Sequence, residues 1–282
     1  MPDSEKITKP KLAFFCSSIR QAASLLDAGK TPVLELPLFI TEETQKFLAE
    51  NKQVIPHFQS ILFEEDFKTA AACLEKLAAS GRRLVWCENT GLADYARKAG
   101  FDIILGSFCN ASNSRSLQTY SELLGAAAVV PSLEISYDDI SRLQIPKGLK
   151  LFYPLVSDEL LMQSRQCLMH NLIDCTKRAC DRTCIEQCEK QFATNGTAGE
   201  SFRAIKRKGF YSGLFSAKSV SNAKAFNLLR DKIDTWLVDI RFLDSNAEKL
   251  LIKAAEDFIL KDENNAFSEP FKNTMQKKFW FC

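Results

Sequence analysis

Short apolar runs alternate with amphipathic segments along the first half of the chain. The runs are rich in β-branched, aromatic and leucine residues, which is the composition of buried strands. Seven runs are predicted as strands, at residues 12–16, 32–38, 53–58, 83–87, 102–108, 128–135 and 149–156. Strands that alternate with helices at this spacing are usually parallel and joined by right-handed crossovers.

The segments between these runs carry signals for the starts and ends of helices. Small polar residues that favour the N-cap position precede the amphipathic stretches, and Gly or Pro follows most of them. The predicted starts lie at Ser17–Ser18, Thr41, Asp66, Thr90, Asn113 and Ser136. Each of the first six predicted strands is therefore followed by a helix, as in a βα unit.

Regular patterning returns near the C-terminus. Residues 191–222 are rich in Gly, Ser, Thr, Lys and Arg and predict a loop or short hairpins, whereas 236–242 predict a strand and 246–260 an amphipathic helix. We therefore expect an α/β fold, a (β/α)8 TIM-like barrel, with a doubly wound open sheet as the alternative. Residues 1–157 would supply seven units, 158–230 a cysteine-rich insertion and basic loop, and 231–282 the eighth unit and a tail.

Charge and hydropathy exclude some classes of partner. The 37 Lys and Arg residues nearly balance the 35 Asp and Glu residues, so any surface for RNA or a partner protein chain must be local. No apolar run approaches the length of a membrane span, and the first residues lack the pattern of a signal peptide. We therefore expect a cytoplasmic protein without membrane attachment, in which clustered thiols are metal ligands or redox groups.

Five of the ten cysteines fall within residues 167–188, at positions 167, 175, 180, 184 and 188. Cys184 and Cys188 would lie on the same side of one helical turn, and Cys167 and Cys175 could approach from a separate turn. Cys180 could replace Cys175 or Cys188. A 4Fe-4S cluster and structural zinc both suit such thiolates, although zinc sites usually use two close pairs and only one is present here. Unligated or redox cysteines are the third interpretation.

Two groups of residues resemble the collagenase-like peptidase family, peptidase family U32. One runs from Gln163 to Leu168 and continues with Cys175 and the segment 181–189, and the other joins the Asn-rich segment 106–114 to residues 131–136. The resemblance is nearest to the branch associated with hydroxylation of cytidine in ribosomal RNA. It implies that the cysteines hold a four-iron cluster and that the protein hydroxylates an RNA pyrimidine, in rRNA or tRNA, or the ring of a quinone precursor. It also implies prephenate as a co-substrate.

Carried over by position, the resemblance implies Cys167, Cys175, Cys184 and Cys188 as cluster ligands. A cysteine that many relatives carry shortly before Cys167 is absent here, so Cys175, Cys180 and Cys16 stay open as the fourth ligand. Peptidase activity and a non-enzymatic, zinc-stabilised protein that binds RNA or a partner are the alternatives. The chain has only two histidines and no evident pairing of a nucleophile with a base, which weakens the peptidase interpretation.

Active-site groups of such barrels lie at the C-terminal ends of the strands. This rule nominates Ser17, Asn89, Asn110, Asn113, Glu134, Ser136, Asp158 and Arg241. Among them we predict Glu134 and Asn110 as catalytic residues and Asn113 as a substrate-binding residue. The alternative for Glu134 is a cap or salt link to the next helix, and for the two asparagines a loop or N-cap role.

Cations and aromatic residues predict where RNA would bind. Arg165 lies beside the cysteines, and Lys206, Arg207 and Lys208 precede Phe210 and Tyr211. Such a mixture can hold phosphates and stack bases, so these four cations are predicted to bind substrate. A solvated loop is the alternative. Both His57, which ends an apolar strand, and His170 are predicted to be structural or surface residues rather than catalytic ones.

Overall fold

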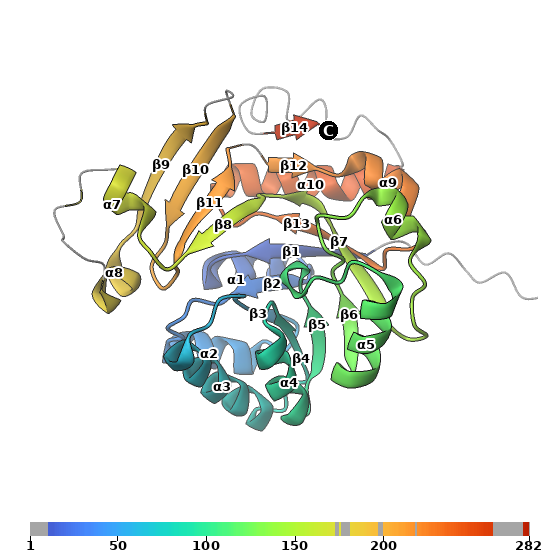
Figure 1. Ribbon diagram of the computed structural model, residues 1–282, viewed down its shortest axis with the longest axis horizontal. Coiled ribbons are helices and arrows are strands. Elements are labelled where there is room, and N and C mark those ends of the chain that lie inside the picture. The colour runs from blue at the N-terminus through green and yellow to red at the C-terminus, as the bar shows by residue number, and fades with distance from the viewer. Residues whose placement is uncertain are drawn as a thin grey trace, which may run out of the picture.

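Eight parallel strands form a closed barrel (Figure 1). The computed structural model describes residues 11–172, 175, 181–196, 200–217, 219–261 and 279–281. The barrel strands are β1 (Lys11–Cys16), β2 (Pro32–Glu35), β3 (Ile55–Phe58), β4 (Leu84–Cys87), β5 (Asp102–Leu105), β6 (Ala126–Val129), β7 (Lys150–Ser157) and β13 (Thr235–Asp239). Because β13 pairs in parallel with both β7 and β1, the sheet closes on itself. The predicted (β/α)8 barrel is confirmed, and the open sheet was the wrong alternative.

Helices surround the barrel and begin close to the predicted capping residues. They are α1 (Ile19–Asp27), α2 (Glu42–Glu50), α3 (Glu64–Ala79), α4 (Thr90–Lys98), α5 (Ser114–Leu124), α6 (Tyr137–Arg142), α9 (Ala223–Leu229) and α10 (Ser245–Lys261). Ser18, Thr41, Asn113 and Ser136 are N-caps whose side chains accept a backbone hydrogen bond in the first turn. Helix α3 begins two residues before the predicted Asp66, whose carboxylate instead accepts from the backbone N–H of Phe63 at 3.2 Å.

Several strands end earlier than the sequence suggests. The predicted strand 102–108 ends at Leu105 and is followed by a 3-10 turn, η1 (Ser107–Cys109), while the predicted strand 128–135 ends at Val129. Pro131 keeps only an isolated bridge to Ala111, and a turn follows it. Phe108, Val130 and Leu133, which follow these strand ends, line the cavity at the barrel mouth instead of continuing the strands, so periodicity alone extended the strands too far.

The inside of the barrel is filled by side chains. Its core consists of Ala13, Val33, Ile55, Trp86, Ile104, Ala128, Val130, Phe152 and Leu237. A second and larger core lies between the strands and the surrounding helices. Because the interior is packed, a ligand can enter only at the mouth, above this layer.

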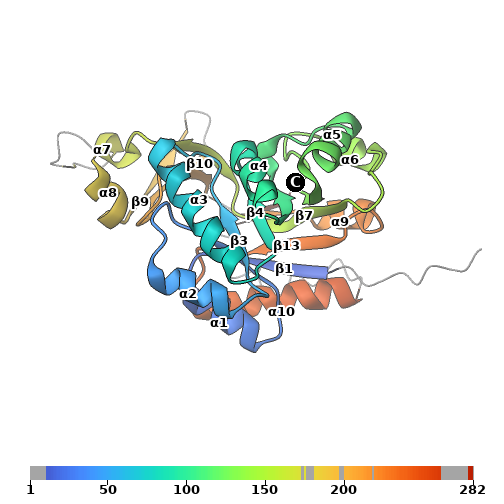
Figure 2. The same ribbon diagram turned by 90° about the horizontal axis from the view of Figure 1, so that it is seen from below.

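A second sheet is inserted between β7 and β13. It contains β8 (Leu160–Ser164), β11 (Ser212–Ser216), β10 (Ser201–Lys206) and β9 (Lys190–Asn195), in that order and antiparallel. The short helices α7 (Leu168–Leu172) and α8 (Arg182–Gln187) belong to the same segment, and β12 (Ser219–Ser221) joins β7 and β14 (Phe279–Phe281). Residues 191–222, for which a loop or short hairpins were expected, thus contain hairpins. Figure 2 shows this sheet and α7 and α8 at one end of the molecule, opposite α5, α6 and α9.

The insertion is docked on the barrel through specific contacts. The backbone N–H of Leu38, after β2, donates to the carbonyl of Gly209 at 2.7 Å, and the Gly209 N–H donates to Ile185 of α8 at 2.6 Å. Gly209 has a φ of 79°, and a Cβ there would overlap Pro37. The buried Tyr211 hydroxyl donates to Asp66 of α3 at 2.5 Å. These contacts fix the turn between β10 and β11 against the β2–α2 loop.

In the part of the chain that the structure describes, no helix has the length and apolarity needed to span a bilayer.

Candidate functional site

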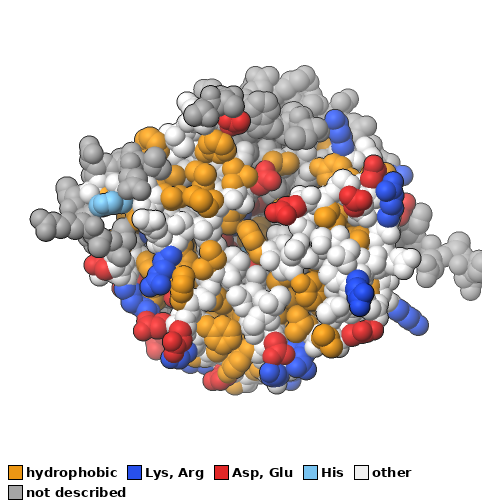
Figure 3. Space-filling view, in the orientation of Figure 1, with side chains coloured by type: hydrophobic (Ala, Val, Ile, Leu, Met, Phe, Trp, Pro, Cys, Tyr) orange, Lys and Arg blue, Asp and Glu red, His pale blue; other side chains and the backbone are white. Residues whose placement is uncertain are grey.

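A cavity of about 150 Å³ lies at the C-terminal ends of the barrel strands. Every barrel strand, or the segment directly after it, contributes to its lining, and β8 of the insertion adds Leu160 and Gln163. Figure 3 shows a hollow near the centre of this face with acidic and apolar side chains at its edge. Since this end of a (β/α)8 barrel carries the active site in characterised enzymes, the cavity is the candidate site.

Aromatic rings form one wall of the cavity. The ring of His57 lies 4.6 Å from that of Phe15 and 5.6 Å from that of Trp86, and all these contacts are edge-on. Phe108 also lines the cavity and is half exposed at its rim. A flat ring bound here would therefore meet ring edges and faces, which is a favourable environment for aromatic ligands.

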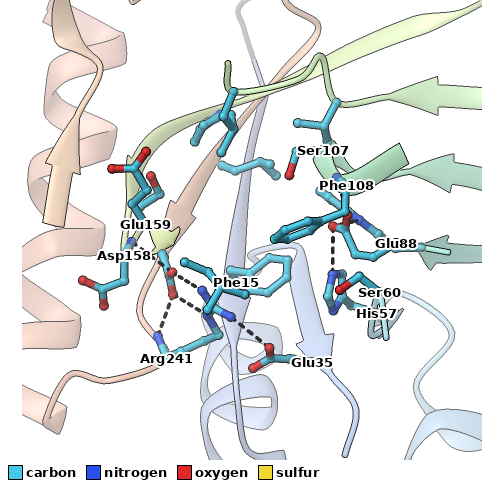
Figure 4. A pocket seen from close by; sticks show the side chains of 18 of the residues that line it. Phe15, Glu35, His57, Ser60, Glu88, Ser107, Phe108, Asp158, Glu159 and Arg241 are labelled. Carbon is cyan, nitrogen blue, oxygen red and sulfur yellow. Dashed lines mark hydrogen bonds and ion pairs between the residues drawn. The ribbon is translucent and has the colours of Figure 1, made fainter. Parts of the chain in front are cut away.

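A buried carboxylate is part of the same side of the cavity. Glu88, the residue after β4, lies 3.1 Å from Nε2 of His57 through Oε1, and the same oxygen accepts from Nε1–H of Trp86 at 2.9 Å. Its other oxygen accepts from the backbone N–H of Phe108 at 3.1 Å. A Cβ at position 106 would overlap this carboxylate, so Gly106 is required for the arrangement. Figure 4 shows Glu88 and His57 together on one side of the cavity.

A group of ion pairs forms the opposite side of the cavity (Figure 4). The guanidinium of Arg241 donates to Asp239 at 2.7 and 2.9 Å and to Glu35 at 2.9 Å. Glu35 also lies 2.7 Å from Arg207 of the insertion. Burial acts to raise the pKa of Glu35, but Arg207 and Arg241 outweigh it and lower that pKa from 4.5 to about 2. Burial acts against the charge of Arg241 too, yet Asp239 and Glu35 raise its pKa.

Asp158, directly after β7, extends these ion pairs toward the insertion. It accepts from Arg203 of β10 at 2.9 Å and from the Ser219 hydroxyl at 2.5 Å, and its backbone N–H donates to Asp239 at 3.2 Å. Burial, followed by the nearby charge of Asp239, raises the pKa of Asp158. The mouth of the barrel and the insertion are thus joined by charged groups with little exposure to solvent.

Strand β8 brings the insertion directly to the cavity. The Gln163 side chain accepts from the Ser60 hydroxyl at 3.1 Å and donates to Gln59 at 3.3 Å, and both partners follow β3. Cys167 lies four residues after Gln163 along the chain. The segment that covers part of the cavity therefore leads straight into the cysteines.

The predicted cluster ligands have different environments. Cys167 and Cys184 are buried, and Cys175 and Cys188 are partly exposed. The Asp181 carboxylate caps α8 by accepting from the Cys184 N–H at 3.0 Å, and the Cys188 N–H donates to the Cys184 carbonyl at 3.1 Å. Within the described residues no three His, Cys, Asp or Glu side chains gather as a metal site. Cys180 lies outside the described residues, as do most of the residues between Leu172 and Asp181.

The chemistry of these donors suits a soft metal group, because thiolates favour iron–sulfur clusters and zinc. Cys167 packs with Met169 and Ala204 in a small apolar core of the insertion, the kind of low-dielectric surrounding that such groups have in proteins. Cys16, the other cysteine considered as a fourth ligand, lies in the barrel and not in the insertion. Its thiol donates to the Val33 carbonyl at 3.4 Å within the core between barrel and helices, and burial raises its pKa.

The residues predicted to act on substrate do not line the cavity. Glu134 is exposed in the turn after β6, and Asn110 is exposed with a left-handed φ of 55° at the end of η1. Asn113 is the N-cap of α5 and accepts from the Ser116 N–H at 2.9 Å. Their roles in catalysis and binding stay predictions. Asp158 and Arg241, nominated by the strand-end rule, do line the cavity.

The predicted RNA-binding cations have unequal exposure. Lys206 is buried and its ammonium donates to the Phe210 carbonyl, whereas Arg207 pairs with Glu35. Lys208 and Arg165 are exposed, and the Arg165 guanidinium lies 4.3 Å from the ring centre of Phe63. Phe210 and Tyr211 are buried, so they do not offer stacking surfaces to a base.

Sequence reasoning missed four of the polar residues of the cavity, Glu35, His57, Glu88 and Asp239. Glu35 and Asp239 lie inside predicted strands, and His57 was set aside as structural. A signal was present: each of these residues is charged or polar within, or directly after, an apolar run that is buried on both faces. Such a residue at the C-terminal end of a barrel strand has to face the mouth.

The sequence model of peptidase family U32 matches residues 40–280, which is most of the chain. The chain belongs to peptidase family U32. No curated protein matched the chain. Among solved structures, this U32 protein is similar to the DHPS of Yersinia pestis, with 11% identity, coverage of 89% of this chain and 95% of that one, and a TM-score of 0.40.

Two structures from Pyrococcus species give comparable values. The tryptophan synthase α-subunit of Pyrococcus furiosus has 10% identity, coverage of 95% and 97%, and a TM-score of 0.44. The ribulose-1,5-bisphosphate carboxylase/oxygenase of Pyrococcus horikoshii has 10% identity, coverage of 95% of this chain and 61% of that one, and a TM-score of 0.46. Similarity at this level says nothing about the activity of the U32 protein.

Proposed function

We propose that this U32 protein is an iron–sulfur enzyme that takes part in hydroxylation of a planar ring bound in the barrel-mouth cavity, with a pyrimidine of rRNA or tRNA as the substrate. The observation that carries the proposal is the cavity itself, with aromatic walls and a covering strand that leads into the cysteines. A cavity of about 150 Å³ is the size that holds a single six-membered ring. A base would have to leave its stack to enter, as bases do in other enzymes that modify them.

The cysteines would hold the cluster in the segment beside the cavity. Cys167, Cys175, Cys184 and Cys188 are the proposed ligands, with Cys180 as a substitute for Cys175 or Cys188. A bound cluster would supply electron transfer. Hydroxylation replaces a ring C–H by C–OH and removes two electrons from the ring, so it needs both an oxygen source and an acceptor for two electrons. Prephenate is the co-substrate that the family resemblance suggests for this step.

The residues of the cavity would bind and orient the ring. Phe15 and Trp86 provide apolar contact, and Gln163 closes one side through Ser60 and Gln59. Together with Leu160 they exclude water from the ring, which strengthens each polar contact that the ring makes.

A second candidate substrate is the ring of a quinone precursor. Two observations favour it. The ammonium of Lys206 and the guanidinium of Arg207 are both engaged inside the protein, which removes two of the four predicted phosphate contacts. In addition, the exposed side chains of Phe108, Leu161 and Met162 line an open groove beside the cavity, which could take an apolar substituent of the ring.

Metal analysis tests the cofactor. Protein purified without oxygen should be brown and contain close to four irons per chain, as a 4Fe-4S cluster requires. Cys184→Ala should lose the iron, whereas Cys73→Ala, which removes a buried thiol from α3, should keep it. A colourless wild-type protein with stoichiometric zinc would contradict the iron–sulfur proposal and favour the zinc-stabilised binding protein.

Product analysis tests the reaction. RNA nucleosides and quinones should be measured by mass spectrometry in a deletion strain complemented with wild type, with Cys184→Ala or with Cys73→Ala. Loss of one hydroxylated pyrimidine, restored by wild type and Cys73→Ala alone, supports the RNA substrate. Loss of a hydroxylated quinone instead supports the second candidate, and unchanged levels of both would refute ring hydroxylation.

A further inference from the structure

The contact between His57 and Glu88 has a defined direction. Glu88 accepts hydrogen bonds from Nε1–H of Trp86 at 2.9 Å and from the backbone N–H of Phe108 at 3.1 Å, groups that can only donate. An ionised carboxylate is an acceptor only, so Nε2 of His57, at 3.1 Å, has to donate its hydrogen to Glu88. A neutral His57 is therefore the tautomer with hydrogen on Nε2 and a lone pair on Nδ1.

Nδ1 of His57 has no hydrogen-bond partner among the residues that the structure describes. The atom is buried, and the His57 side chain as a whole is only 7% exposed. Buried polar atoms without a partner are rare in folded proteins and reduce stability. His57 lines the cavity but its Nδ1 atom is closed to water, so a donor on a bound ligand reaches it when the side chains around the imidazole shift slightly.

The surrounding residues fix the imidazole rather than merely fill space. The rings of Phe15 and Trp86 hold it edge-on at 4.6 and 5.6 Å. Gly106 leaves the space that the Glu88 carboxylate occupies, and any side chain there would displace it. Three consecutive barrel strands, β3 to β5, thus contribute to one oriented His–carboxylate pair.

We propose that His57 is a catalytic base that takes a proton from an N–H or O–H group of the bound ring, and that Glu88 is the residue that positions it. The inference rests on the proposed function for the identity of the reaction but not for ligand binding. The ring N–H or O–H bond breaks, its electron pair stays on the ring, and a new N–H bond forms at Nδ1. The imidazolium then lies between the ring anion and Glu88, and the reverse transfer restores both groups.

This step suits ring hydroxylation because a deprotonated ring is richer in electrons and reacts more readily with an electrophilic oxygen donor. It consumes no oxidant or reductant. General base catalysis by a positioned side chain contributes roughly 100-fold to 10,000-fold to a rate. The ligand class is a planar ring with one donor at its edge, such as a pyrimidine N–H or a phenol O–H.

Two matched small probes test the acceptor. Pyrrole and furan are rings of the same size, and only pyrrole carries an N–H donor. Wild-type protein should prefer pyrrole over furan by about tenfold, since furan leaves the buried acceptor unpaired. His57→Phe keeps an aromatic ring but lacks the acceptor, so its preference should fall by about the same factor. An equal pyrrole-to-furan ratio in the two proteins, or failure of both probes to bind wild type, would overturn the proposal.

Nitrogen NMR tests the tautomer and the role of Glu88. The chain has two histidines, so histidine-selective 15N labelling gives two sets of signals, and exposed His170 is an internal control. His57 Nδ1 should show the shift of an unprotonated nitrogen and move upfield when pyrrole binds. In Glu88→Gln the amide NH2 must face either the Trp86 N–H or the Phe108 N–H, both of which only donate, so the amide holds the His57 imidazole less firmly and the pyrrole preference should fall. A wild-type His57 with hydrogen on Nδ1 would refute the assignment.

These measurements distinguish the proposed role of His57 from the proposed ring hydroxylation. If the pyrrole preference and tautomer are as expected but no hydroxylated product depends on the protein, the base stands and the proposed reaction fails. If the product depends on Cys184 but is made normally by a folded His57→Phe variant, the reaction stands and His57 is not its base.

Discussion

The two polar sides of the cavity are built in different ways. The His57–Glu88 pair and its partners Trp86 and Phe108 come from β3, β4 and the turn after β5, all within the barrel. The opposite side, around Arg241, joins barrel residues to Arg203 and Arg207 of the insertion. Phe15 lies between the two, with its ring centre 4.6 Å from the His57 ring and 4.7 Å from the Arg241 guanidinium (Figure 4).

This difference separates two tasks. The barrel alone orients the His57 imidazole, so that pair does not depend on how the insertion is placed. The Asp158–Arg203 and Glu35–Arg207 ion pairs form only when the insertion is docked, whereas Arg241 pairs with Glu35 and Asp239 within the barrel. We therefore expect changes on the Arg241 side to alter stability and docking, and changes on the His57 side to alter ligand selectivity.

The largest effect is expected from Glu35→Gln. This change leaves the guanidiniums of Arg207 and Arg241 facing an uncharged amide, although both are largely buried. Removing one partner of a buried ion pair typically costs about 3–5 kcal/mol of unfolding free energy. Urea unfolding at neutral pH measures it.

Glu64→Ala is the matched control for that change. It breaks the exposed Glu64–Lys68 pair, whose side chains are 81% and 70% exposed, and should cost less than about 1 kcal/mol. If the two variants lose the same stability, the Arg241 side contributes no more than a surface ion pair. The pyrrole preference of Glu35→Gln should match that of wild type, because His57 and Glu88 are unchanged.

Low pH should weaken the ion pairs of Glu35 on the Arg241 side of the cavity. The arginines lower the pKa of Glu35 from 4.5 to about 2, against the opposing effect of burial. Its stabilising contribution is fully present above pH 4.5 and is lost as the pH falls toward 2. The difference in unfolding free energy between wild type and Glu35→Gln should therefore shrink by on the order of 3 kcal/mol over this range. A difference that stays constant with pH would contradict the ionised Glu35.

The two sides also differ in how far the sequence predicts them. Helix starts are local: Ser18 and Asn113 were expected as N-caps because each bonds a backbone N–H three residues away. Arg241 and Asp158 were found by the strand-end rule. The sequence did not predict the His57–Glu88 pair, because this pair depends on the register of three strands and on the absence of a side chain at position 106.

The cysteine segment shows the opposite case. Sequence spacing singled out Cys167, Cys175, Cys184 and Cys188, and the described structure adds burial for two of them without gathering three ligands. Such a site depends on the metal as much as on the chain, because ligand groups converge when the metal binds. The fold was predictable because it follows from repeated local patterns, whereas ligand convergence does not.

Gly106→Ala should break the His57 side specifically. The added methyl group would overlap the Glu88 carboxylate and push it from Trp86 and His57. Overpacking of this kind costs about 1–3 kcal/mol, and the pyrrole preference should fall with it. Chemical unfolding and probe binding measure both effects. Gly91→Ala is the control, because its nearest contact is Asn89 at 3.2 Å and its φ is not positive. A variant that keeps wild-type selectivity would show that Glu88 does not position His57.

The smallest effect on stability is expected from Lys208→Ala. This variant tests whether Lys206 and Lys208, two residues apart, have different roles. Lys206 is buried and stabilises the fold, whereas Lys208 is exposed and lies 3.6 Å from an equally exposed Glu189. Loss of the Lys208 ammonium should therefore change the free energy of unfolding by less than about 0.5 kcal/mol.

If RNA crosses this surface, Lys208→Ala should weaken RNA binding and lower the slope of log affinity against log salt by about one. Lys224→Ala, an exposed lysine on α9, should leave the slope unchanged. Filter binding across a salt series measures both slopes. Equal slopes for wild type and Lys208→Ala would remove Lys208 on the outer face of the β10–β11 turn from the RNA path and leave docking of the insertion as the role that the contacts of this turn support.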